Sequence, residues 1–205
     1  MRYLFFDVDG VIIKGWNFSE GKRKLWYENI HNDFNIDYVA IRDFFNSNIF
    51  VDVLRGKYDL IDSIGHFFRH KDINIDATNF VRYWFEKDAF LDKPLLEWLS
   101  QIEGMKCLAT IQEHHRASYL WNDLGLRSFF SEIFYSGSIG YLKDEPAFFH
   151  YINTFCNIKF EQDEVLYFDD NPNFVETATS CGWKAFCIER TEQIQHILNS
   201  ISHKM

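Results

Sequence analysis

Two pairs of closely spaced aspartates each follow a run of apolar residues. The pairs are Asp7 and Asp9, after YLFF, and Asp169 and Asp170, after EVLYF. Carboxylates that are crowded together repel each other unless a cation joins them. Hard oxygen ligands suit Mg²⁺, which takes a few carboxylates, water molecules and substrate phosphate oxygens. If the two pairs meet in the folded chain, they therefore predict a magnesium site for a phosphate-bearing substrate.

Two further polar residues stand where they can reach the same place. Thr110 ends the apolar run MKCLA, and Lys143 follows the stretch EIFYSGSIGYL. In an open α/β sheet, ligands bind outside the carboxyl ends of the strands, however far apart those ends lie in the sequence. Asp7, Thr110 and the pair at 169 and 170 would then project into one crevice, with Lys143 within reach.

The elements that must position these residues alternate along most of the chain. Short, nearly continuous apolar runs predict the strands of a parallel sheet covered on both faces. They lie at 2–6, 105–109, 132–136, 164–168 and 183–188. Helical patterns lie between them, several with an early proline or a terminal glycine. These lie at 93–104, 115–125, 145–156, 171–182 and 191–201. This alternation predicts a doubly wound α/β fold.

Residues 15 to about 90 interrupt this alternation. The segment has no strong strand run, but several of its stretches have a helical pattern. These stretches lie at 20–31, 38–50, 59–70 and 77–90. We therefore expect a helical insertion after the first strand. The predicted boundaries are 1–14 and 89–205 for the α/β core, and 15–88 for the insertion.

The composition favours a folded, cytoplasmic protein and argues against a nucleic-acid or membrane partner. Hydrophobic residues make up 47% and aromatic residues 19% of the 205 residues, which is too much for a disordered chain. The net charge of −9 argues against a nucleic-acid partner, because neutralising phosphates requires a basic surface. The sequence begins directly with a strand pattern and no apolar run approaches ~18 residues, so we expect no signal peptide and no membrane span. The four cysteines form no C-x-x-C pair and fit free thiols in a reducing compartment.

The motifs together resemble those of the haloacid dehalogenase (HAD) superfamily, in particular its phosphatases with a small helical cap after the first strand. DVDGV at 7–11 is similar to the first family motif, and Thr110, at the end of LAT, to the second. Lys143 is similar to the third, and YFDDNPNFVETATSCGW at 167–183 to the fourth. The motifs span the chain in the family's order. The resemblance implies a HAD-like, Rossmannoid sheet with an α-helical cap at 15–88.

The resemblance also implies a role for each acid. Asp7 would be the nucleophile that forms an aspartyl-phosphate. Asp9 would protonate the leaving oxygen and then take a proton from the attacking water. Asp7 and Asp170 would bind Mg²⁺ through their carboxylates, and Asp9 through its backbone carbonyl. Asp169 would support the metal site, through water or as a weaker ligand.

Other residues would hold the substrate, again by resemblance. Thr110 and the backbone N–H of Ile111 would donate hydrogen bonds to the phosphoryl oxygens. Lys143 would offset the phosphoryl charge and hold Asp7 ionised. Trp16 lies just after the first motif, where family members often line the entrance of the site, so it either lines that entrance or packs inside the cap.

These assignments predict a Mg²⁺-dependent phosphatase for a small phosphorylated metabolite, with a sugar phosphate as the first choice. A cap that closes over the crevice would exclude bulky macromolecules. HAD dehalogenases work without metal and lack the second aspartate, so Asp9 favours phosphoryl transfer. Two alternatives stay open, namely a phosphomutase on the same core and a non-catalytic binding protein on a HAD scaffold.

Three positions depart from the family pattern. Ile111 stands where Asn often follows the second motif, which alters how the phosphate or the cap is contacted. Asp144 replaces the proline that usually follows the third-motif lysine, and it could pair with Lys143. Phe174 replaces a frequent Asn in the fourth motif, where we expect an adjustment of packing.

Each motif also has an interpretation without catalysis. Asp and Gly favour turns, so the first motif could be a plain turn. Asp170 could be the N-cap of the helix at 171–182. Thr110 could merely cap a strand, and Lys143 could be a solvated surface residue. The joint occurrence of all four motifs in order favours the functional interpretation.

Overall fold

The computed structural model describes residues 1–14 and 25–202. Within these residues the strands are β1 (Arg2–Phe6), β2 (Met105–Thr110), β3 (Glu132–Tyr135), β4 (Glu164–Asp169) and β5 (Lys184–Cys187). They form one parallel sheet in the order β3-β2-β1-β4-β5, so the first strand lies in the middle. All five predicted strands are confirmed, and so is the doubly wound α/β fold.

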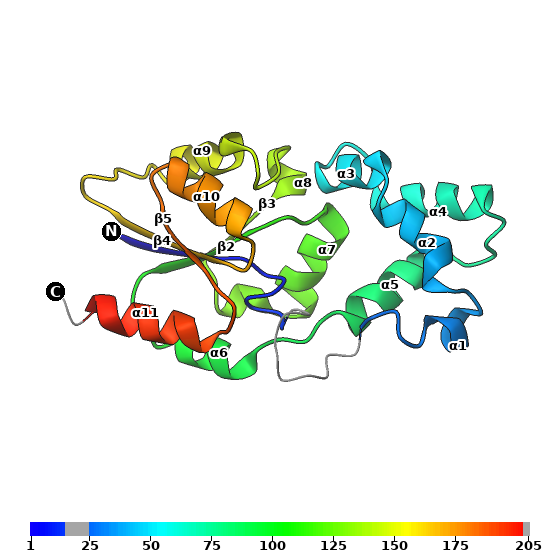
Figure 1. The fold of residues 1–205 in the computed structure, drawn as a ribbon, viewed down its shortest axis with the longest axis horizontal. Coiled ribbons are helices and arrows are strands. Elements are labelled where there is room, and N and C mark those ends of the chain that lie inside the picture. The colour runs from blue at the N-terminus through cyan, green and yellow to red at the C-terminus, as the bar shows by residue number, and fades with distance from the viewer. Residues whose placement is uncertain (15–24, 203–205) are drawn as a thin grey trace.

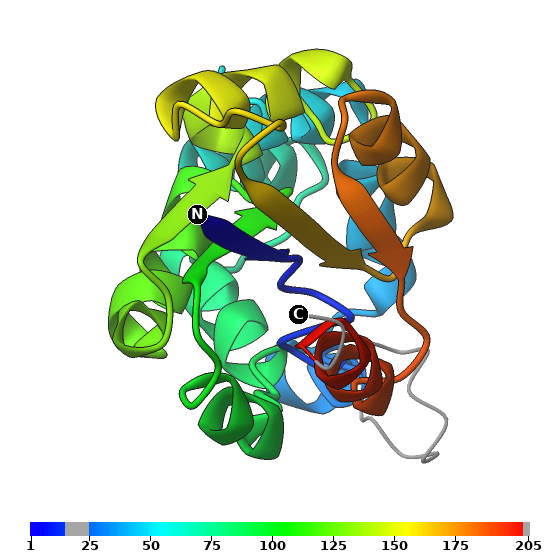
Figure 2. The same cartoon turned by 90° about the vertical axis from the view of Figure 1, so that its left-hand side faces the viewer.

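Helices cover both faces of this sheet (Figures 1 and 2). One face carries α9 (Pro146–Phe155) and α10 (Pro172–Ser180), and the other carries α6 (Lys93–Leu99) and α11 (Glu192–Ser202). Successive side chains of β1 point to opposite faces. Leu4 and Phe6 therefore join the core cluster on the α6 side, whereas Tyr3 and Phe5 join the cluster on the α9 side.

Two of the predicted core helices differ from the structure in extent. The helix predicted at 93–104 ends at Leu99, and the chain turns before Gly104, whose φ of 123° favours glycine. The helix predicted at 115–125 begins as α7 (His114–Ser118), continues as a π-helical turn at Tyr119–Asp123 and ends in a 3₁₀ turn at Leu126–Ser128. Within the π-helical turn, Leu120 packs against the sheet while Tyr119 packs against the inserted helices.

The described part of the insertion forms short helices with a core of their own. They are α1 (Ile30–Phe34), α2 (Tyr38–Phe45), α3 (Asn48–Leu54), α4 (Leu60–His70) and α5 (Ala77–Lys87), and we call them the α1–α5 bundle. Their buried side chains form a cluster separate from the two clusters of the sheet. The stretch 38–50 was predicted as one helix but is two, because the Ser47 side chain accepts a hydrogen bond from Phe50 N and begins α3. Within the helix predicted at 20–31, residues 26–29 form turns instead.

The α1–α5 bundle lies beyond the carboxyl end of the sheet (Figure 1). The two chain crossings between bundle and core are tied together by backbone hydrogen bonds. Lys14 N donates to Phe90 O at 2.9 Å, and Asp92 N donates to Ile12 O at 2.9 Å. The bundle is therefore attached through a paired double connection, which keeps it over the strand ends.

Two ion pairs near the surface also link the bundle to the core. Arg55 pairs with Glu145 at 2.6 Å and also donates to Gly140 O at 3.5 Å, just after α8 (Ser136–Ile139). His115 of α7 lies 2.7 Å from Asp59, the N-cap of α4. Both links are partly exposed, so they orient the bundle more than they stabilise it.

The described helices are all too short or too polar to cross a membrane. The four cysteines are free, as predicted. Cys107 is buried in a central strand, as expected. Both cysteines lie in predicted strands, for which we expected buried thiols, but Cys187 is exposed because β5 is an edge strand of the sheet.

Candidate active site

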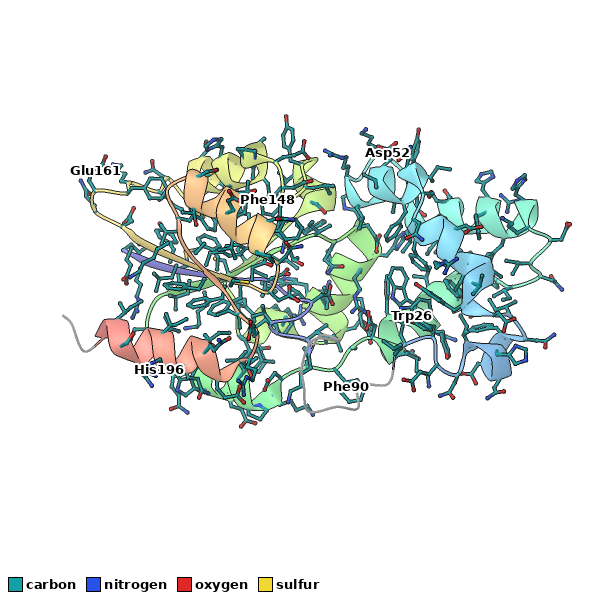
Figure 3. All side chains as sticks on the ribbon, in the orientation of Figure 1. Trp26, Asp52, Phe90, Phe148, Glu161 and His196 are labelled. Atoms are coloured by element: carbon teal, nitrogen blue, oxygen red, sulfur yellow. The ribbon has the colours of Figure 1, made fainter. Side chains whose placement is uncertain are left out.

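A pocket of about 720 Å³ opens between the carboxyl ends of the central strands and the α1–α5 bundle. The core lines it with Asp7, Asp9, Gly10, Thr110, Ile111, Lys143, Asp170, Asn171 and Phe174, and the bundle side with Leu25, Trp26, Tyr27 and Asp88. Figure 3 shows Trp26 where the bundle faces the core. Most of the predicted site residues thus share one pocket. Asp169 lies behind its wall, and Trp16 lies outside the described residues.

Lys143 is buried between two aspartates. Its Nζ lies 2.8 Å from Asp7 Oδ1 and 2.7 Å from Asp169 Oδ2, and only 1% of its side chain is exposed. Burial lowers the pKa of Lys143, but Asp169 and Asp7 raise it by more, so the ammonium stays protonated. The interpretation as a solvated surface lysine is therefore wrong. Asp144, which was considered as a partner, is exposed instead.

Asp169 anchors this lysine from behind. Besides Lys143, its carboxylate accepts hydrogen bonds from the Tyr167 hydroxyl and, at 2.8 Å, from the backbone N–H of Asn171. The residue is fully buried, so these bonds hold it in one orientation. Asp169 thereby fixes the position from which Lys143 meets Asp7.

Three carboxylates lie close enough to share one cation. Asp7, Asp169 and Asp170 each present an oxygen, and these oxygens all lie within 4.8 Å of one another. Burial raises the pKa of Asp7, and Lys143 opposes that rise. Burial and the charge of Asp169 raise the pKa of Asp170 to about 6. The protein alone thus compensates these charges incompletely, and a hard divalent cation such as Mg²⁺ fits the set of oxygen donors.

Asp170 is free for this role because another residue caps the following helix. The N-cap of α10 is Asn171, whose side chain accepts a hydrogen bond from Asn173 N at 3.0 Å. The interpretation of Asp170 as the N-cap is therefore wrong. Its carboxylate instead occupies the space beside Gly10, where an added Cβ would overlap it.

Gly10→Ala should therefore weaken both the fold and the cation site. Gly10 has a φ of 90°, a conformation that side chains disfavour. The backbone strain alone should lower the free energy of unfolding by about 1–2 kcal/mol, and the new Cβ should displace Asp170. Gly125→Ala is a matched control, because Gly125 has a φ of 73° with nothing within 4 Å of the added Cβ. Urea unfolding and Mg²⁺ titration should show a stability loss in both variants but a loss of Mg²⁺ affinity only in Gly10→Ala. Equal Mg²⁺ affinities would contradict the predicted site.

Asp9 is held by two side chains to which sequence reasoning assigned no role. Gln112 Nε2 donates to Asp9 Oδ2 at 2.5 Å, and Arg116 Nη2 lies 3.8 Å from Asp9 Oδ1. Both belong to the segment that leaves β2 after Thr110. That position, a few residues beyond a strand end that reaches the site, is the signal that could have found them.

The turn after β2 presents Thr110 and Ile111 to the pocket. Gln112 N donates to Ser136 Oγ at 3.1 Å, and Ser136 Oγ lies 3.1 Å from Gln112 O, to which it donates in turn. Ser136 is fully buried, so this turn is fixed to the start of α8. Thr110 is 1% exposed, and Gln112 Nε2 lies 3.4 Å from its hydroxyl oxygen.

Aromatic rings form part of the pocket wall. Phe174, at a position expected only to adjust packing, places its ring centroid 4.8 Å from Lys143 Nζ. On the bundle side, Tyr27 stacks on Tyr38 with 3.8 Å between ring centroids, and Trp26 packs edge-on against Tyr38. These rings come from the insertion, and sequence analysis had assigned neither Trp26 nor Tyr27 to the pocket.

The fold and the site define a Rossmann-like α/β protein with a cluster of acidic residues at its strand ends that fits a cation. Within that class, the chain belongs to the haloacid dehalogenase-like hydrolases, because the model of this family matches residues 1–182. The resemblance seen in the motifs is therefore confirmed at the level of the family. No curated protein matches the sequence.

Solved structures with the same fold come from several organisms. A HAD family enzyme of Bacteroides thetaiotaomicron, in complex with magnesium and inorganic phosphate, is 15% identical, with a TM-score of 0.72 over 91% of this chain and 93% of that one. A HAD phosphatase of Thermococcus onnurineus is 19% identical, with a TM-score of 0.55 over 90% and 85%. A candidate β-phosphoglucomutase of Thermotoga maritima is 18% identical, with a TM-score of 0.54 over 90% and 84%. At these identities the likeness establishes the fold alone.

Proposed function

We propose that the chain is a Mg²⁺-dependent phosphatase that hydrolyses a small phosphorylated metabolite through an aspartyl-phosphate on Asp7. One observation carries the proposal, namely that Asp7, Asp170 and a buried Lys143 meet at one end of a pocket that also contains Asp9 and Thr110. This set contains a nucleophile, a proton donor and groups that stabilise phosphoryl charge. The magnesium and phosphate bound to the Bacteroides enzyme, and the phosphatase from Thermococcus, support it.

The proposed reaction has two steps. In the first, an Asp7 oxygen attacks phosphorus, and the bond to the leaving oxygen breaks as Asp9 gives that oxygen a proton. In the second, Asp9 takes a proton from water as the water oxygen attacks phosphorus, and the bond to Asp7 breaks to release phosphate. Thr110 and Lys143 stabilise the charge on the phosphoryl oxygens. Mg²⁺, held by Asp7, Asp170 and the backbone carbonyl of Asp9, would supply further charge neutralisation.

We also propose that residues 15–88 act as a cap that restricts the substrate to small molecules. A pocket of about 720 Å³ has the size of a metabolite site, and the bundle covers one side of it. A sugar phosphate remains our first candidate, and Trp26 and Tyr27 favour a leaving group with one apolar face.

We further propose a cytoplasmic location, on the basis of the free thiols. The net charge of −9 disfavours a nucleic-acid partner.

Phosphate release from p-nitrophenyl phosphate and from a panel of phosphorylated metabolites tests the proposal. We expect release with Mg²⁺ and none with EDTA. Asp170→Asn should reduce the rate at least ~100-fold, since even groups that only support a metal ligand contribute ~10–100-fold. Glu161→Gln is the matched control, because this exposed acid lies at the end of the molecule far from the bundle (Figure 3). Hydrolysis that survives both EDTA and Asp170→Asn would refute the metal-dependent mechanism.

A phosphomutase is the second candidate, supported by the similarity to the Thermotoga structure. Such an enzyme would return the phosphoryl group to the substrate. The same panel would then show conversion of a sugar phosphate into its isomer without accumulation of phosphate. A folded, Mg²⁺-binding protein that produces neither phosphate nor isomer would instead favour the non-catalytic binding protein on this scaffold.

A further inference from the structure

The guanidinium group of Arg116 is buried between the core and the α1–α5 bundle, and the proposed reaction does not use it. It lies on α7, soon after the turn that carries Thr110, and only 3% of it is exposed. Burying a cation is costly unless polar or charged partners surround it. The partners of Arg116 therefore indicate its role.

Two of these partners are backbone carbonyls at the end of α5. Nη1 donates to Phe85 O at 3.1 Å, and Nη2 donates to Asp88 O at 2.8 Å. The last carbonyls of a helix lack partners within the helix and carry its partial negative charge. The guanidinium also lies over the rings of Phe85 and Tyr119, at 5.2 and 5.8 Å from their centroids. Arg116 thus holds the end of the last bundle helix, just before the chain returns to the core.

Two carboxylates also lie near Nη2, namely that of Asp88, with Oδ2 at 3.9 Å, and that of the proposed proton donor, Asp9. The Nη2 atom that donates to Asp88 O also lies 3.8 Å from Asp9 Oδ1. Gln112 holds the other Asp9 oxygen, with 2.5 Å between Nε2 and Oδ2. The Asp9 carboxylate therefore lies between two groups of the segment after β2, and one of them is itself fixed by the bundle.

We propose that Arg116 is a positioning residue that couples the seating of the bundle on the core to the orientation of the Asp9 carboxylate. The inference rests on the proposed phosphatase reaction. While the end of α5 is in place, its carbonyls fix the guanidinium, and the charge of the guanidinium attracts the nearer Asp9 oxygen, which lies 3.8 Å from Nη2. When the bundle lifts, Arg116 loses those carbonyls and Asp9 loses its fixed neighbour. Proton donation to the leaving group is then efficient only while the pocket is covered.

A purely structural role makes a different prediction. If Arg116 only capped α5, its loss would slow every substrate alike. If it positions Asp9, the loss depends on how much the leaving group needs a proton. p-Nitrophenyl phosphate and phenyl phosphate have similar shapes, which makes them a matched pair. p-Nitrophenolate leaves readily without a proton, whereas phenolate is about as basic as the side chain of tyrosine, with a pKa of ~10.

The test compares kcat/KM for these two substrates in wild type, Arg116→Met and Arg55→Met. Arg55 is the matched control, because it also joins the bundle to the core but does so through Glu145 and Gly140. Arg116→Met should lower kcat/KM for phenyl phosphate ~10–100-fold more than for p-nitrophenyl phosphate, which is part of the ~10²–10⁴-fold that a general acid contributes. Arg55→Met should leave the ratio of the two values unchanged. This ratio does not depend on the folded fraction, so partial unfolding does not mask the result.

Arg116→Lys provides a second variant if Arg116→Met does not fold. Lysine keeps the charge but replaces the planar fork with a single point of contact, so an intermediate ratio is expected. Equal losses on both substrates, in Arg116→Met or in Arg116→Lys where only that variant folds, would overturn the positioning role. If the wild type with Mg²⁺ releases phosphate neither from these two substrates nor from the metabolite panel, the proposed function fails and the inference fails with it. A failure of the proposed function is distinguishable from a failure of the inference alone, because it is already visible in the wild type before any substitution is made.

Discussion

Asp7→Asn should reduce the rate of phosphate release at least ~10⁴-fold, because removing the nucleophile from a set of residues that acts as a unit disables the whole set. The amide keeps the shape of the side chain and can still accept the hydrogen bond from Val8 N, which is 2.8 Å long in the wild type. It is too weak a nucleophile to form an acyl phosphate. Since burial raises the pKa of Asp7, a neutral side chain is tolerated there, and we expect the variant to stay folded.

Asp92→Asn provides the matched control for this prediction. Asp92 is also a buried aspartate, but its carboxylate accepts hydrogen bonds from Leu95 N and Thr191 Oγ1 and does not line the pocket. Asp92 is the N-cap of α6, and asparagine is an equally good N-cap, so the control should retain the wild-type rate within a few-fold. Rapid quenching should trap a phosphorylated chain in the wild type and none in Asp7→Asn. An Asp7→Asn rate within about tenfold of wild type would exclude Asp7 as the nucleophile.

The strand ends were predictable because buried parallel strands consist of nearly continuous apolar runs. The run at 164–168 became β4, which pairs with β1 so that Asp169 and Asp170 arrive beside Asp7. Parallel pairing alone brings these acids to one edge of the sheet, and no knowledge of the loops is needed. Lys143 is different, since it lies in a loop without periodicity. Its position after a predicted strand put it within reach of the site, but only the family resemblance gave it a role.

The site residues that sequence analysis missed have partners that are set by how the bundle packs against the core. Arg116 has several partners, and the two that accept its hydrogen bonds, Phe85 O and Asp88 O, are backbone atoms of the insertion. No spacing rule within one helix encodes such a contact. The break between α2 and α3 is of another kind, because Ser47 is a favoured N-cap residue and could have been recognised from its type. The π-helical turn at Tyr119–Asp123 carries no comparable local signal.

Lys143→Met should cause the largest loss of stability among these substitutions. Methionine has a similar length but no charge, so Asp7 and Asp169 would face each other in the interior without the intervening cation. Breaking a buried ion pair by removing one partner costs about 3–5 kcal/mol, which urea unfolding in EDTA would measure. Lys57→Met is the control, because Lys57 pairs with Asp52 at 2.8 Å with 60% of its side chain exposed (Figure 3 labels Asp52). An exposed pair of this kind contributes ~0–1 kcal/mol.

The dependence on pH and Mg²⁺ separates the lost charge of Lys143 from its lost packing. Burial lowers the pKa of Lys143, but Asp169 and Asp7 raise it by more, so its pKa is higher in the folded than in the unfolded chain. The charge of Lys143 therefore stabilises the fold fully at a pH below the unfolded-state pKa. This contribution is lost only as the pH rises through the folded-state pKa. Burial raises the pKa of Asp7, so protonation of Asp7 favours the folded state as pH falls, and more so once Lys143 no longer opposes that rise. The stability gap between variant and wild type should therefore narrow from about pH 8 to about pH 5. Mg²⁺ at the higher pH should narrow it as well, because the cation joins the same carboxylates. A gap that neither pH nor Mg²⁺ changes would mean that the fold depends on the aliphatic stem of Lys143 and not on its charge.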